Sequence, residues 1–166
     1  MTEPETQFAS ILDLLAKSGV HFAVVGGLAG VAHGSARATR DIDVVYARDP
    51  ENVRRLVSAL AAYNPYLRGA PPGLPFRWDE RTIQSGLNFT LTTCLGDLDL
   101  LGEVTGGGNY HQLLPFTEPM ELFGTPCRCV TLEKLIQLKR AAGRVKDLEA
   151  IAELQALLEE RRKMAD

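Results

Sequence analysis

Two pairs of aspartates carry the clearest chemical signal in this chain of 166 residues. Asp41 and Asp43 stand one residue apart at the start of an apolar run that predicts a strand. Residues i and i+2 of a strand point to the same face of a sheet, so the two carboxylates converge. Side by side they repel each other, and a divalent cation such as Mg²⁺ (or Mn²⁺) removes that repulsion. The pair therefore predicts a metal site.

The second pair, Asp97 and Asp99, occurs in the segment GDLDLLGE. Asp97 follows a glycine in a predicted turn, where water solvates it. Asp99 lies deeper, between two leucines, where a lone carboxylate needs a partner. A third carboxylate on a neighbouring strand would complete a site for two metal ions, which stabilises both the attacking and the leaving oxygen of a displacement. We therefore expect Asp99, and not Asp97, to join the first pair.

A glycine pair, Gly26 and Gly27, ends the apolar strand that precedes these acids. No Gly-Lys-Ser/Thr follows, which excludes a P-loop. A dinucleotide-binding turn has the pattern G-x-G-x-x-G and an acid after the second strand, whereas here the pattern is G-G-x-x-G and both acids precede the apolar residues. Two interpretations remain, a tight turn that leads into a packed helix or a backbone cradle for the phosphates of a nucleotide.

Hydrophobic periodicity and turn residues predict the elements that must position these motifs. Between residues 64 and 86 periodicity is lost in a stretch rich in proline and glycine, which predicts a long irregular insertion of functional importance. A glycine-rich loop is predicted at 103–109. The predicted helices cover 4–17, 28–34, 50–60, 110–114, 132–142 and 144–163, and the predicted strands cover 21–25, 41–47, 87–95, 97–102, 120–124 and 125–130, the last two as short edge strands.

Three segments together carry a resemblance to a known family: GGLAGVAHGSARATRDIDVV, GDLDLLGE and LKRAAGRVKDLEAIAEL. They resemble the nucleotidyltransferase fold of the DNA polymerase β superfamily, and within it the small bacterial enzymes related to AbiEii and MenT-type toxins. The resemblance implies an α/β (α+β) fold, in which helices flank a small mixed β-sheet. It implies a single domain over 1–166, with a core at about 20–130 and a C-terminal helical segment at about 131–163.

The resemblance also assigns roles to the motif residues. Asp41 and Asp43 would hold the metal pair, and Asp99 would bind the catalytic metal beside the attacking hydroxyl. The backbone N–H groups of Gly26 and Gly27 would hold the triphosphate. All three aspartates are thus both catalytic and metal-binding candidates.

Further nucleotide-binding candidates follow from the same resemblance. Many superfamily members have serine where this chain has a second glycine, and Ser35 is the candidate to replace its hydroxyl. Arg37 and Arg40 approach a phosphate or are solvated loop charges. Lys139 and Asp147 correspond by position to a lysine and an aspartate that line the nucleotide pocket in the related toxins. Their alternative role is an ion pair on a charged helix face.

The expected activity is metal-dependent transfer of NMP from an NTP, ATP included, to an acceptor hydroxyl with release of pyrophosphate. The acceptor stays open among a tRNA 3′ end, a protein side chain and a small molecule such as an aminoglycoside, and a cognate antitoxin is a possible partner of a toxin-type enzyme. The alternatives are a non-catalytic nucleotide-binding or antitoxin-like module of the same fold and a dinucleotide-binding domain.

Composition and charge bear on the binding partners and the cellular location of the protein. A formal net charge of −3 argues against a protein that coats nucleic acid by bulk attraction and leaves room for a local basic groove. The acidic N-terminus lacks the apolar core of a signal peptide, and no apolar stretch is long enough to cross a membrane, so we expect a cytoplasmic protein. Cys127 and Cys129 are expected to be buried, reduced thiols, and His33 and His111 to be structural.

Overall fold

A mixed sheet of seven strands forms the centre of the structure, a computed structural model that describes residues 2–166. The strand order is β3-β4-β5-β2-β1-β9-β8, in which β1–β9 and β2–β5 are parallel and the other neighbours antiparallel. The strands are β1 (Phe22–Val25), β2 (Ile42–Tyr46), β3 (Tyr66–Leu67), β4 (Phe89–Thr93), β5 (Gly96–Leu101), β8 (Thr117–Leu122) and β9 (Thr125–Val130), and a separate pair is formed by β6 (Glu103–Val104) and β7 (Gly108–Asn109).

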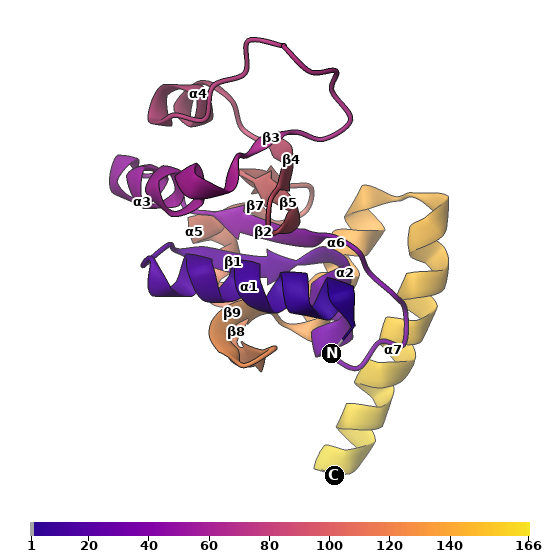
Figure 1. Cartoon of the computed structure of the whole chain (residues 1–166). Coiled ribbons are helices and arrows are strands. Elements are labelled where there is room, and N and C mark those ends of the chain that lie inside the picture. Colours follow the sequence, from indigo (N-terminus) through magenta and orange to yellow (C-terminus); the bar gives the residue numbers. More distant parts are fainter. Residues whose placement is uncertain (1) are drawn as a thin grey trace.

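Helices surround this sheet, and the last two pack against each other at one end of it (Figure 1). The helices are α1 (Glu3–Lys17), α2 (Gly26–Ala32), α3 (Pro50–Leu60), α4 (Glu80–Ser85), α5 (Tyr110–Leu113), α6 (Leu132–Ala142) and α7 (Val145–Ala165), with 3₁₀ turns at Ala61–Tyr63 and Leu114–Phe116. The mixed sheet flanked by helices confirms the predicted fold class.

Local sequence signals explain where the helices begin and which face they bury. A capping box between Thr2 and Glu5 starts α1, and its apolar stripe of Phe8, Ile11, Leu12 and Leu15 is buried. Asp49 caps α3 by accepting a hydrogen bond from the backbone N–H of Asn52, and Pro50 follows at the first helical position. These signals are local, so the sequence alone predicted both helices.

Pairing between distant segments fixes the arrangement of the acids. β1 and β2 pair antiparallel with Val25 opposite Asp43, so the glycine turn after β1 lies next to the start of β2. β2 and β5 pair parallel with Asp43 opposite Asp99. The turn and the two acidic strands therefore meet at one edge of the sheet.

Four sequence predictions about elements were wrong in detail. The helix predicted from residue 28 begins at Gly26, directly after the strand. The segment 125–130 is no edge strand, because β9 lies between β1 and β8, and of the two predicted edge strands only β8 lies at an edge. The insertion 64–86 contains β3 and α4, and the loop 103–109 contains the β6–β7 hairpin. The place of β9 and the pairing of β3 depend on segments distant in sequence, which periodicity does not report.

The remaining expectations concern thiols and membranes. The three cysteines are free, and burial raises the pKa of Cys127 to about 11 and that of Cys129 to about 12, so both are protonated, unreactive thiols. Cys129 is fully buried and Cys127 partly so. No helix within residues 2–166 is both long and apolar enough to cross a bilayer.

Candidate functional site

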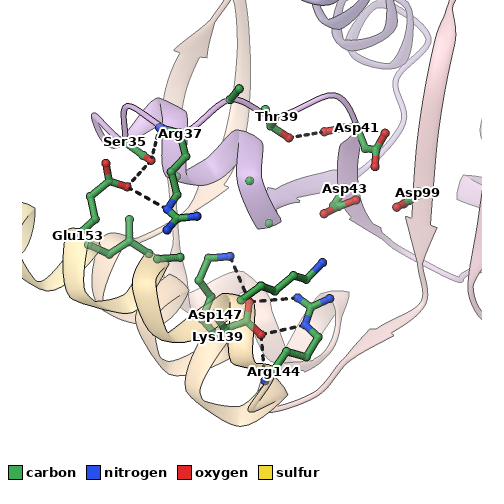
Figure 2. A pocket seen from close by; sticks show the side chains of 17 residues that line it. Ser35, Arg37, Thr39, Asp41, Asp43, Asp99, Lys139, Arg144, Asp147 and Glu153 are labelled. Carbon is green, nitrogen blue, oxygen red and sulfur yellow. Dashed lines mark hydrogen bonds and ion pairs between the residues drawn. The ribbon is translucent and has the colours of Figure 1, made fainter.

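A cavity of about 330 Å³ opens where the glycine turn, the two acidic strands and the last two helices meet (Figure 2). Its walls come from α2, the segment 35–41, β2, β5, α6 and α7. Every site residue predicted from the sequence lines it except Arg40, namely Gly26, Gly27, Ser35, Asp41, Asp43, Asp99, Lys139 and Asp147. Segments more than a hundred residues apart thus contribute to one site.

Three carboxylates lie together on the sheet side of the cavity (Figure 2). Asp43 and Asp99 are direct neighbours in the parallel β2–β5 pair, and Asp41 stands just before β2. Burial, followed by the neighbouring Asp99 and Asp41, raises the pKa of Asp43 to about 7, against a smaller lowering by Arg68. A positive charge beside this carboxyl group would favour its ionised form.

The carboxylates of the cavity fit a divalent metal in part. Within residues 2–166 no group of three or more acidic, histidine or cysteine side chains is gathered closely enough to form a complete metal site. The adjacent pair of Asp43 and Asp99 nevertheless fits Mg²⁺, which is typically bound through one or two carboxylates plus the phosphates of a substrate. The raised pKa of Asp43 agrees with that fit, because the bound ion would favour the ionised form.

Close approach explains the first glycine of the turn. Gly26 has a φ of +66°, and a Cβ atom there would collide with the Asp43 carboxylate. Any other residue would separate the turn from β2. No side chain caps the N-terminus of α2, so its first N–H groups have no side-chain acceptor within the described chain.

The second glycine faces a hydroxyl from elsewhere in the chain. A Cβ atom at Gly27 would lie 2.8 Å from Thr39 Oγ1, which is closer than real Cβ contacts. Thr39 therefore stands beside the position that a serine would take, with its hydroxyl donating to the Asp41 carbonyl oxygen at 3.3 Å. Ser35, the substitute expected from the sequence, donates instead to Glu153 Oε1 on α7 at 2.5 Å. Thr39 was missed because threonine in a loop carries no local signal.

The segment 35–37 is tied to α7, and this separates the two arginine candidates. Arg37 lines the cavity and pairs with Glu149 at 3.0 Å, while Glu153 also accepts the backbone N–H of Ala36 at 3.0 Å. Arg40 is exposed and lies outside the lining. The structure therefore brings Arg37, and not Arg40, to the site.

Basic groups lie on the opposite side of the cavity, held by one buried acid. Asp147 is 2 % exposed, and its carboxylate contacts Lys139 Nζ at 3.9 Å and Arg144 Nε at 2.8 Å. Burial raises the pKa of Asp147, but the hydrogen bonds and charge of Arg144 outweigh it and hold the pKa below its usual value. Burial lowers the pKa of Lys139, against the opposing effect of Asp147. Asp147 thus orients two cations.

This geometry has counterparts among solved structures. The lincosamide antibiotic adenylyltransferase LnuA, in its lincomycin-bound crystal structure, superposes with a TM-score of 0.61 at 18% identity, over 91% of this chain and 96% of that one. A putative nucleotidyltransferase from Thermotoga maritima gives 0.56 at 16% identity over 90% of both chains. An antigenic nucleotidyltransferase-like protein from Paracoccidioides brasiliensis gives 0.57 at 15% identity, over 93% of this chain and 76% of that one.

The chain has the nucleotidyltransferase fold. This confirms the fold predicted from the sequence, while membership of the superfamily and the narrower likeness to AbiEii and MenT-type enzymes stay predictions. No protein-family model and no curated protein sequence matches the chain. The likeness therefore rests on the arrangement of the elements, which the three segments quoted above had indicated.

Two histidines of this nucleotidyltransferase fold differ in their surroundings. His33 is 4 % exposed, with Nε2 2.7 Å from the Val130 carbonyl oxygen and Nδ1 3.0 Å from Arg161 Nη2. It joins α2 to β9 and α7, as expected of a structural histidine. His111 is exposed and its ring lies against Tyr110.

One residue beside the acids was not predicted at all. Arg68 follows β3 in the insertion 64–86, and its guanidinium lies within ion-pair distance of Asp41, Asp97 and Asp99. An arginine in a stretch rich in proline and glycine belongs to no periodic pattern, so the sequence does not predict which residues it contacts. Only the pairing of β3 with β4, which itself pairs with β5, brings it to the acids.

Proposed function

We propose that the protein transfers NMP from an NTP to an acceptor hydroxyl and releases pyrophosphate. The observation that carries this proposal is the meeting, in one cavity, of the Asp43–Asp99 pair, the glycine turn and the basic group around Lys139. The sheet side of that cavity carries carboxylates that favour a cation, and the helix side carries basic groups that favour an anion. A metal-bound triphosphate satisfies both at once.

The residues divide the work of the transfer between them. Asp43 and Asp99 would hold the metal between the strands, with Asp41 beside them. Lys139 holds the phosphate chain, and Asp147 keeps its ammonium aimed into the cavity. Backbone N–H groups at Gly26 and Gly27 complete the cradle. The acceptor oxygen then bonds to the α-phosphorus as the bond to pyrophosphate breaks, with no covalent enzyme intermediate.

A bound divalent cation supplies charge neutralisation on the phosphate oxygens during this step. Strand order decides which carboxylate lies nearest the acceptor. Asp99 lies on the strand away from the glycine turn, which is the side left for the acceptor hydroxyl. Asp99 is therefore the carboxylate assigned to the attacking oxygen.

A second cavity favours a small organic acceptor that has an apolar part. It has a volume of about 380 Å³ and shares Gly26, Asp43, Lys139 and Arg144 with the first. Its remaining wall is largely apolar, with contributions from Leu101, Val104, Leu135, Leu138 and Ala142. A hydroxyl compound bound there would contact Asp43, whose neighbour Asp99 lies opposite it on β5. LnuA, of the same fold, was solved with lincomycin bound. Transfer to tRNA or protein, and with it a toxin role and a cognate antitoxin, is kept as an outcome of the test.

The test measures the transfer directly. The protein is incubated with each α-labelled NTP, Mg²⁺ and three acceptor pools: small hydroxyl compounds that include lincosamides and aminoglycosides, total RNA, and cell protein. We expect label in the small-molecule pool and stoichiometric pyrophosphate. Asp43→Asn should abolish both, and Asp13→Asn, an exposed acid on α1, serves as the matched control. Label in RNA or protein instead would replace the acceptor proposal and leave the transfer intact.

Two other activities make different predictions in the same assay. A non-catalytic nucleotide-binding or antitoxin-like module would bind NTP in the presence of Mg²⁺ and release no pyrophosphate with any pool. A dinucleotide-binding domain would be stabilised against melting by NAD without Mg²⁺. Either result would overturn the proposed transfer.

A further inference from the structure

Arg68 stands between the carboxylates of the cavity and the insertion 64–86. Its Nη2 lies 2.8 Å from Asp99 Oδ1, its Nε 3.3 Å from Asp97 Oδ2, and its Nη1 3.8 Å from Asp41 Oδ2. A single guanidinium is thus within ion-pair distance of three carboxylates. Its side chain is 24% exposed, so water weakens these interactions only in part.

The geometry of these contacts differs from that of a structural arginine pair. A guanidinium paired for stability donates two parallel hydrogen bonds to one carboxylate. Arg68 Nε and Asp99 Oδ1 are instead shielded from solvent without a hydrogen-bond partner in the described chain, even though the charges are close. The guanidinium donates one good hydrogen bond, from Nη2 to the Leu91 carbonyl oxygen at 2.7 Å. The guanidinium is thus shared among Asp41, Asp97 and Asp99 and forms a paired hydrogen bond with none of them.

The main chain at Arg68 is held by contacts of its own that do not involve the guanidinium. The N–H of Arg68 donates to the Thr90 carbonyl oxygen at 3.0 Å, which fixes the main chain against β4. Gly69 follows with a φ of +77° and nothing within 4 Å of a Cβ built there. The chain then extends away from the sheet as an exposed loop (Figure 1). Because backbone hydrogen bonds hold the main chain here, displacement of the guanidinium would not require the sheet to move.

We propose that Arg68 is a built-in counter-ion of this cluster, which neutralises Asp41 and Asp99 in the metal-free protein and is displaced when a divalent cation binds. The identity of the cation as Mg²⁺ or Mn²⁺ rests on the proposed function. Arg68 competes with the metal for the same oxygens, so it is a positioning residue that weakens metal binding in the absence of nucleotide. Phosphate oxygens then supply the ligands that tip the balance toward the metal.

Metal affinity without nucleotide tests the competition. Mn²⁺ binding is measured by electron paramagnetic resonance for the full-length wild type, for Arg68→Gln and for Arg77→Gln. Arg77 is the matched control, because it is exposed on the same insertion and forms no ion pair within residues 2–166. We expect Arg68→Gln to bind Mn²⁺ about tenfold more tightly than the wild type, and Arg77→Gln to change affinity about twofold or less. Equal or weaker binding by Arg68→Gln than by Arg77→Gln would overturn the proposal.

A second measurement follows the wild type itself and does not depend on the folding of Arg68→Gln. The side-chain Nε–H signal of Arg68 is followed by nuclear magnetic resonance and assigned with Arg68→Lys, which retains the charge. Saturation with Mg²⁺ should shift this signal and accelerate its exchange with water, because the guanidinium leaves the cluster. A signal that stays unchanged while the metal binds would mean that Arg68 is a fixed structural residue.

The outcomes separate this inference from the proposed transfer. If Arg68→Gln gains Mn²⁺ affinity but no acceptor pool is labelled, the counter-ion holds and the transfer fails. If label is transferred but Arg68→Gln gains nothing, the transfer holds and the counter-ion fails.

Discussion

The two walls of the cavity differ in how the charge of their carboxylates is balanced. The sheet wall, made of Asp41, Asp43 and Asp99, has its positions fixed by strand register. The helix wall, made of Lys139, Arg144, Lys146 and Asp147, has its positions fixed by an internal ion-pair group at the start of α7. Only the helix wall includes the counter-charge that it needs.

The difference shows in how easily each buried acid ionises. Asp147, on the helix wall, has a pKa below its usual value because Arg144 and Lys139 compensate its burial. Asp43, on the sheet wall, has a pKa raised to about 7 because burial disfavours its charged form and its neighbours Asp99 and Asp41 are themselves acids. The carboxylate of the helix wall is therefore balanced by basic side chains of the same wall. Within residues 2–166 the carboxylates of the sheet wall have only Arg68, which comes from outside the cavity lining, as an ion-pair partner. A divalent cation would therefore bind at the sheet wall, where negative charge is in excess.

The largest expected effect comes from removing the acceptor-side acid of the sheet wall. Asp99→Asn should lower the rate of transfer on the order of a hundred- to a thousandfold and leave NTP binding nearly intact, because it removes the ligand on the attacking side. Asp97→Asn is the matched control, since Asp97 lies two residues away on the same strand and does not line the cavity. Single-turnover transfer is the measurement, and a greater loss in Asp97→Asn would contradict the assignment.

The helix wall is tested by Lys139→Ala. Loss of a charge-assisted hydrogen bond to phosphate should weaken NTP binding by roughly ten- to a hundredfold. The melting temperature should change little, because Arg144 continues to satisfy Asp147. Lys139 is less exposed than an ordinary helix-surface lysine, at 16% for its side chain, so Arg140→Ala on the same helix provides the control for stability. Unchanged NTP affinity would return Lys139 to a purely structural role.

A pH titration of stability sharpens the contrast between the walls. The pKa of Asp43 is raised from 3.8 to about 7 in the folded protein, so the folded state binds more protons than the unfolded state between these values. Stability is therefore fully present below about pH 4 for this group and decreases as pH rises through 7. In EDTA, the melting temperature should fall from pH 5 to pH 8, and it should fall less in Asp43→Asn. Equal slopes for both proteins would remove Asp43 as the source.

The smallest effect is expected at the hydroxyl beside the glycine turn. Thr39→Val keeps the size of the side chain and removes one neutral hydrogen-bonding group, so NTP binding should weaken by about fivefold. The pair Thr39→Gly with Gly27→Ser moves the hydroxyl to the second glycine and relieves the 2.8 Å contact, so it should bind NTP more tightly than Thr39→Gly alone. No gain from the added serine would mean that neither hydroxyl meets the nucleotide.

Much of the sheet wall was predictable because its signals are short-range. Two acids at i and i+2 of a strand share a face, so the sequence predicted Asp41 and Asp43 side by side. Both line the cavity, although β2 begins only at Ile42 and the direct neighbour of Asp43 is Asp99. A lone acid between leucines predicted that Asp99 needs a partner. The glycine turn, the capped helices and the strands around it follow from the same kind of local pattern.

Other parts of the site depended on contacts between segments far apart. Ser35 was predicted to face the phosphates, but Glu153 on α7 accepts its hydroxyl. Arg40 was predicted at the site, and Arg37 lines the cavity in its place. Thr39 and Arg68 carried no sequence signal, because a loop residue acquires a partner only when another element reaches it.

The sequence by itself determined which groups this protein can use: three candidate metal-binding acids, a turn that only glycine fits, and a basic cluster around a helix break. Periodicity and side-chain chemistry fix these features within a few residues. The tertiary structure alone decided what meets what, because the parallel register of β2 with β5 sets Asp43 against Asp99 and the edge strand β3 delivers Arg68 to the same acids. Strand pairing joins residues whose separation along the chain leaves no trace in either local segment.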